Sequence, residues 1–168
     1  MAIFKTRIMR MQGYFLFILL LVFPSVNAQK KAEINWKSWA ELEQALKKAP
    51  KPVFIFFHAE WCAYCKKIER EIFTNQKVIN KLNSDYYAVE MDVETTDTIY
   101  FDNIKLVNKQ ALTQRNGVHQ LALLLANRKG TPFSLPATII LNSDFAVKKR
   151  IFEYYTSAEL LEILQEGD

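Results

Sequence analysis

The feature that most constrains this chain is a buried-strand pattern that runs directly into its only two cysteines. Residues 53–57 read Val-Phe-Ile-Phe-Phe, an uninterrupted apolar run typical of a core strand. Cys62 and Cys65 follow, and residues 66–73 then place apolar side chains at helical spacing. The cysteine pair is therefore predicted to lie where the strand gives way to a helix N-terminus. There the helix dipole and unpaired N–H groups favour a thiolate, so the pattern indicates a redox site.

The N-terminal segment has the layout of a secretory signal peptide. A basic head with three Lys and Arg residues precedes an apolar run over residues 14–23, and small residues lead to Ala28. The apolar run is short for a membrane span, and an uncleaved anchor is the alternative. We therefore expect a signal peptide over residues 1–28 and an exported, periplasmic or otherwise extracytoplasmic, domain over residues 29–168.

Composition narrows the classes of partner and the role of the cysteines. Cleavage after Ala28 would leave 140 residues, enough for one compact domain, with 19 basic and 18 acidic side chains. This near-neutral balance gives no support to a nucleic-acid or anionic-membrane partner. A disulfide between Cys62 and Cys65 would close a very small ring, which constrains little of the unfolded chain. Stability is therefore a poor reason for the pair to exist.

Periodicity and capping signals predict an alternation of strands and helices along the rest of the chain. The expected elements are a short strand at 33–36, a helix opened by the Ser38–Glu41 capping box, a strand at 53–58, the cysteine helix with a break at Asn75, a strand at 87–93, a hairpin within 98–107, a helix at 119–127, strands at 137–141 and 145–152, and a last helix opened by a Thr156–Glu159 capping box. This order describes a mixed sheet with helices on both faces.

Two segments carry a resemblance to a known family. Residues 57–66 read Phe-His-Ala-Glu-Trp-Cys-Ala-Tyr-Cys-Lys, and residues 135–141 read Leu-Pro-Ala-Thr-Ile-Ile-Leu. Together they resemble the thioredoxin family, in which a cis-proline loop packs beside the active-site disulfide. The resemblance implies an α/β thioredoxin-like fold, with a central mixed β-sheet flanked by helices and an insertion before the cis-proline loop. Residues 69–73 and 91–93 are most similar to exported thioredoxin-like proteins and DsbD-type C-terminal domains.

The resemblance also implies roles for individual residues. Cys62 would be the nucleophile and the more exposed sulfur, with a pKa below the free-thiol value of about 8.5. Its thiolate would form a mixed disulfide with a substrate, which Cys65 would then resolve. Trp61 would cover one side of the site and Pro136 the other. The Leu135–Pro136 bond is expected to be cis, and its backbone is expected to pair with an extended substrate strand.

One position departs from the family pattern. Thioredoxins usually carry a buried acid six residues before the first cysteine, where it helps to move the proton of the second. In this chain that position is Phe56. Glu60, Glu69 and Glu90 are the candidate replacements as proton acceptor, and water or the leaving thiolate is the alternative.

These observations lead to a functional expectation with one alternative from another class. We expect a monomeric exported thiol–disulfide oxidoreductase that reduces disulfides of envelope proteins, without a cofactor or metal. Its partners would be disulfide-containing client proteins and a membrane thiol reductant. The alternative is a non-enzymatic copper-binding or delivery module, in which His58 would join Cys62 and Cys65 as a ligand. Residues 95–134 would form either a lid over the site or a structural insertion away from it.

Overall fold

A computed structural model describes residues 32–165. The signal peptide predicted over residues 1–28 lies outside the described residues. The central sheet has the strand order β2-β1-β5-β6, in which β1 and β2 are parallel and the other neighbours antiparallel. These strands are β1 (Val53–His58), β2 (Tyr87–Asp92), β5 (Ala137–Leu141) and β6 (Val147–Ile151). The predicted mixed α/β sheet is confirmed.

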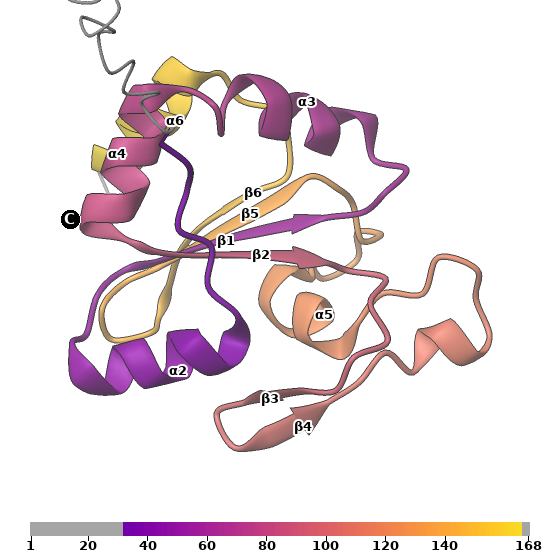
Figure 1. The fold of residues 1–168 in the computed structure, drawn as a ribbon. Helices are drawn as coiled ribbons and strands as arrows, with labels where there is room; N and C mark the ends of the chain where they lie inside the picture. The colour runs from indigo at the N-terminus through magenta and orange to yellow at the C-terminus, as the bar shows by residue number, and fades with distance from the viewer. Residues whose placement is uncertain (1–31, 166–168) are drawn as a thin grey trace, which may run out of the picture. The chain divides into compact units, whose positions relative to one another are not determined.

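Helices cover both faces of this sheet. They are α2 (Trp39–Lys48), α3 (Ala63–Glu71), α4 (Gln76–Asp85), α5 (Gln120–Ala126) and α6 (Ser157–Gln165). Figure 1 shows α3, α4 and α6 on one face, and α2 and α5 on the other. In the part of the chain that the structure describes, none of the helices is long and apolar enough to cross a membrane.

The core is built around β1, which lies between two neighbouring strands and under helices on both faces. Residues 53–57 are fully buried, which explains their uninterrupted apolar sequence. Phe54 and Phe56 share one face and both meet Phe73 edge-on, with ring centroids 6.0 and 4.9 Å apart. Phe73 follows α3, so these contacts fix the cysteine helix on the central strand.

The helix starts that the sequence predicts are present. Ser38 and Glu41 form a reciprocal capping box at α2, and Thr156 and Glu159 exchange the same contacts at α6. Asn75 caps α4 by accepting from two backbone N–H groups, which explains the predicted break after α3. Local capping chemistry therefore sets the boundaries of three of the helices on these two faces.

Two of the predicted strands differ in the structure. Residues 33–36 form no strand, because only Trp36 makes a single bridge to the sheet. The helix predicted at 119–127 is present as Gln120–Ala126, capped by His119 and Asn127, and the chain then turns through Gly130 with φ 72°. β6 begins at Val147 instead of residue 145, because Phe145 takes φ 66° in the preceding turn.

The insertion before Pro136 contains the predicted hairpin, formed by β3 (Ile99–Phe101) and β4 (Ile104–Leu106). Asp102 and Asn103 make its tight turn with φ 50° and 59°. A 3-10 helix at Gln110–Leu112 was not predicted. Phe101 packs edge-on against Trp39 of α2, and Figure 1 shows the hairpin on the side of α2, away from α3. The hairpin is thus a structural insertion and does not form a lid.

Candidate redox site

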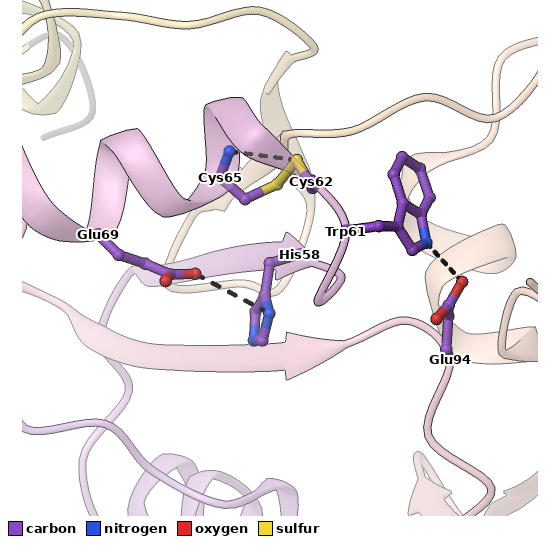
Figure 2. The surroundings of a disulfide bond; sticks show 6 residues. All are labelled: His58, Trp61, Cys62, Cys65, Glu69 and Glu94. Carbon is purple, nitrogen blue, oxygen red and sulfur yellow. Dashed lines mark hydrogen bonds and ion pairs between the residues drawn. A yellow bond between two sulfur atoms is a disulfide. The ribbon is translucent and has the colours of Figure 1, made fainter.

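Cys62 and Cys65 form a disulfide at the N-terminus of α3, shown in Figure 2. The two sulfurs are 2.04 Å apart and the two Cα atoms 5.2 Å apart. Both cysteines are buried, with Cys62 4% exposed and Cys65 0% exposed. Cys62 is therefore slightly more exposed than Cys65, the order expected for an attacking and a resolving cysteine.

The helix start places one sulfur among backbone donors. Cys62 is the N-cap of α3, and its Sγ accepts a hydrogen bond from the backbone N–H of Cys65 at 3.1 Å. Helix N-caps are normally Ser, Thr, Asp or Asn, whose side-chain oxygens satisfy the free N–H groups of the first turn. Here a sulfur takes that position, at the positive end of the helix dipole, where negative charge is stabilised.

Trp61 forms one border of the site and is held by a residue that the sequence analysis missed. Its ring is 58% exposed, and its Nε1–H donates to Glu94 Oε1 at 2.7 Å (Figure 2). Glu94 lies in the loop after β2. Because β1 and β2 are parallel, with His58 opposite Asp92, the segments that follow both strands meet at one sheet edge. That parallel pairing was the signal that could have found Glu94.

A second aromatic border of the site is formed by Tyr64, two residues after Cys62. Tyr64 is 61% exposed, and its ring centroid lies 6.3 Å from that of Tyr154, in the loop before α6. Lys67 Nζ lies 4.4 Å from the Tyr154 ring centroid, and the Tyr154 hydroxyl donates to Glu71 at 3.3 Å. A hydrogen bond from Arg70, together with Lys67 and Tyr154, lowers the pKa of Glu71. Glu71 is therefore a charged acceptor for Tyr154 at neutral pH.

Pro136 is buried at the start of β5, and the Leu135–Pro136 peptide bond is cis. The antiparallel register pairs Ala137 with Phe57. Pro136 therefore lies beside the end of β1 that leads to Cys62. The structure brings it to the same edge of the sheet as the disulfide.

The three candidate acids lie in two different places. Glu60 has a side chain that is 90% exposed and pairs with Lys66 at 3.0 Å, away from the sheet. Glu69, from α3, has Oε1 3.9 Å from His58 Nδ1, and Figure 2 shows the two side chains pointing toward each other. Glu90 is opposite Phe56 in the parallel register. Glu90 is exposed on β2, yet desolvation of its carboxyl raises its pKa. His58 lowers the pKa of Glu90 and Glu69 raises it, so these three groups form one electrostatic cluster.

Comparison with known proteins identifies the family. A profile of proteins described as thioredoxin-like matches residues 35–132, which is more than half of the chain and includes both cysteines. The chain belongs to the thioredoxin-like family. Its Cys62–Cys65 pair makes it a thiol–disulfide oxidoreductase of that family.

Its relatives include the thiol:disulfide interchange protein DsbD of Salmonella typhimurium, which is 40% identical over 60 residues. That alignment covers 33% of this chain and 11% of DsbD, so the chain spans about a tenth of this relative's length. A solved structure named DsbH oxidoreductase matches with a TM-score of 0.56 and 18% identity, covering 86% of this chain and 91% of that one. The reduced C-terminal domain of Neisseria meningitidis DsbD gives 0.50 and 17%, covering 79% and 99%. These structural likenesses support the thioredoxin fold.

In this thioredoxin-like site, Phe56 has a buried polar neighbour on β5, the strand next to β1. Phe56 pairs with Thr138 of β5, whose Oγ1 lies 2.9 Å from the hydroxyl oxygen of Tyr155. Both side chains are buried, and burial strongly raises the pKa of Tyr155, which stays protonated at neutral pH. Sequence reasoning missed this pair, because its two residues lie 17 positions apart in different segments.

The copper-module alternative receives no support from the site. Within residues 32–165, no three His, Cys, Asp or Glu side chains are grouped so that they could hold a metal ion. His58 instead lies beside Glu69 and stacks on Phe56, with ring centroids 5.8 Å apart. In this thioredoxin-like protein His58 therefore belongs to the acidic cluster of the sheet.

Proposed function

We propose that this protein is exported and uses Cys62 and Cys65 to reduce disulfide bonds of envelope proteins. The observation that carries the proposal is the disulfide itself, in which Cys62 is 4% exposed and Cys65 is fully buried, with the exposed side chains of Trp61 and Tyr64 near Cys62 in the chain. This arrangement favours attack through one sulfur and resolution through the other. The similarity to part of DsbD, a thiol:disulfide interchange protein, also supports it.

The reaction starts from the reduced protein and transfers two electrons to the client. The Cys62 thiolate attacks one sulfur of the client disulfide, forms a mixed disulfide and releases the first client thiolate. The Cys65 thiolate then attacks Cys62 Sγ, which closes the Cys62–Cys65 disulfide and releases the second client thiolate. A dithiol reductant, which we place in the membrane, reduces the pair again by the same exchange.

The client segment binds in an extended conformation between the two aromatic borders. Trp61 and Tyr64 flank Cys62, and the backbone around Pro136 offers main-chain groups at the same edge of the sheet. Main-chain pairing with an extended segment is a common mode of peptide recognition. The exposed rings then contact the side chains next to the client cysteine.

Glu90 is our choice as the proton acceptor for Cys65, with His58 and Glu69 modulating its charge. It lies beside Phe56, the position at which other thioredoxins carry their buried acid, and its pKa is raised above the usual carboxyl value. A raised pKa makes a carboxylate a better base near neutral pH. Glu60 is excluded from this role because its side chain pairs with Lys66 in solvent.

Insulin-disulfide reduction tests the proposal directly. Cys62→Ser is expected to abolish turnover, and Cys65→Ser is expected to accumulate a mixed disulfide with the client on non-reducing gels. The double variant, which can form neither species, is the matched control. Full turnover by both single variants would overturn the proposal.

Export needs a separate measurement. Expression of the full chain in a Gram-negative host is expected to yield a periplasmic protein whose first residue is Gln29, determined by N-terminal sequencing. A protein that keeps residues 1–28 and stays in the membrane fraction would instead identify an uncleaved anchor.

A further inference from the structure

A side chain near the end of the insertion contacts both the segment before β5 and the segment after β6. Arg128 follows α5, and its Nη2 donates to Ser134 Oγ at 2.8 Å. Its guanidinium carbon lies 4.0 Å from the centroid of the Phe152 ring, just after β6. One side chain thus joins the loop that leads to Pro136 with the loop that carries Tyr154.

A second arginine fixes the same region from the opposite direction. Arg150, on β6, donates from Nε to the backbone oxygen of Leu125 in α5 at 2.7 Å. The turn between α5 and this loop is closed by the Thr131 N–H, which donates to the Arg128 oxygen at 3.2 Å. The Arg150 hydrogen bond therefore holds α5 against β6, and the turn holds the backbone of Arg128 in place.

The geometry suits arginine and no other side chain. A planar guanidinium can stack on an aromatic face while an N–H at its edge donates a hydrogen bond, whereas an ammonium is a point charge without a stacking plane. Arg128 is only partly buried. Its two contacts are consequently made in a partly desolvated setting, where a stacked, hydrogen-bonded cation is stronger than on an open surface.

We propose that Arg128 is a positioning residue for client binding, because it holds residues 134–136 in the conformation that receives an extended client. This inference rests on the proposed function, in which the backbone around Pro136 pairs with the client. The inference also gives the insertion a role in client recognition. Its last residues set the conformation of the backbone before Pro136, whereas its hairpin lies away from the disulfide. A small-molecule disulfide can react with Cys62 without pairing with the backbone around Pro136.

The test compares a protein disulfide with a small one. Arg128→Ala is expected to raise KM for insulin about tenfold or more, the loss typical of a hydrogen bond from a charged donor, with kcat nearly unchanged. Reduction of the small disulfide DTNB and the redox potential are expected to stay at wild-type values. Ser134→Ala removes only the acceptor and is expected to raise KM in the same way without a cavity. Lys129→Ala, the neighbouring exposed cation, is the matched control.

Each outcome has a distinct meaning. Arg128→Lys is expected to recover only part of the insulin KM, because lysine cannot both stack and donate in this geometry. An unchanged insulin KM in both Arg128→Ala and Ser134→Ala would overturn the inference. An equal loss with insulin and DTNB would also overturn it, because that pattern identifies a structural role. If the wild-type protein reduces neither substrate, the proposed function itself fails.

Discussion

Phe56 of β1 and Glu90 of β2 lie directly opposite each other in the parallel register, so an apolar ring and a carboxyl share the row where thioredoxins carry their buried acid. In the proposed mechanism, Glu90 on the edge strand β2 takes the role of that acid. His58 and Glu69 complete the cluster around that carboxyl. This relationship leads to the first prediction.

Glu90→Gln is expected to slow the resolution of the mixed disulfide by Cys65 by roughly a hundredfold or more, the contribution of a positioned base. A base acts only when deprotonated, and the pKa of Glu90 is raised above 4.5. Wild-type resolution is therefore expected to fall as the pH drops through that raised pKa, and Glu90→Gln is expected to lose this inflection. Stopped-flow Trp61 fluorescence measures the step.

Glu90→Gln is expected to lower the rate of resolution but to increase the stability of the folded protein. The two measurements therefore separate a role of Glu90 as a base from a role in stability. A raised pKa means that the folded protein disfavours the ionised carboxylate, so stability decreases as the pH rises through the window between the unfolded and folded pKa values. Neutral Gln at position 90 is expected to make the protein slightly more stable at pH 7 in urea unfolding. Glu60→Gln is the control for both measurements, and an equal loss of rate there would contradict our choice of Glu90.

Glu94→Ala is expected to release Trp61 and to raise KM for a protein client about fivefold, as for the loss of one hydrogen bond of ordinary strength. Glu94→Gln keeps an amide oxygen as acceptor for the indole N–H and is expected to stay close to wild type. Trp61 fluorescence anisotropy, measured on both variants, should report a more mobile ring only in the first. Identical mobility in the two variants would remove the positioning role of Glu94.

Tyr154 is expected to contribute to the choice of client through its contact with Tyr64. Tyr154→Ala removes the ring that Tyr64 and Lys67 contact, whereas Tyr154→Phe keeps both ring contacts and loses only the hydrogen bond to Glu71. We expect Tyr154→Ala to reduce the preference for disulfide peptides with an aromatic residue beside the cysteine. Competition between Phe-flanked and Gly-flanked peptides measures this, and an unaltered preference would refute it.

His119 is expected to make the insertion sensitive to acid. Its ring is fully buried, Nδ1 accepts from the Leu121 N–H at 3.1 Å, and Nε2 lies 3.1 Å from the Asp97 oxygen. Burial lowers the pKa of His119, with Asp97 acting against this effect. As pH falls below the unfolded value of about 6.5, the unfolded state binds the proton first, so stability decreases toward the lower folded pKa.

His119→Asn keeps a neutral N-cap acceptor and is expected to flatten this dependence, although it lowers stability overall. Urea unfolding at about pH 7.5 and about pH 5.5 compares the two proteins across the window in which histidine titrates. An unchanged acid sensitivity in His119→Asn would assign the effect to another group.

Much of this molecule follows from local sequence patterns. The apolar run of β1, the capping residues Ser38, Asn75 and Thr156, and the turn at Asp102 and Asn103 each predicted an element that the structure contains. Such signals need only neighbours along the chain, because capping and turn formation are local. The site residues Cys62 and Cys65 came from the same kind of pattern.

Contacts between distant segments could not be predicted in this way. Glu94 meets Trp61 across 33 residues, Arg150 meets Leu125 across 25, and Thr138 meets Tyr155 across 17. Each pair depends on strand register and on the path of the insertion, and no local periodicity specifies either. The positive φ of Phe145 was also unpredictable, because large side chains rarely adopt it.

The central claim is that Cys62 and Cys65 form a reversible dithiol–disulfide couple whose potential is low enough to reduce client disulfides. A redox titration of the protein against dithiothreitol or glutathione, read by thiol alkylation, tests it most directly. We predict a two-electron transition near the thioredoxin value of roughly −270 mV. A potential near about −120 mV would indicate an oxidant of client proteins, and the absence of any reversible transition would contradict the redox function itself.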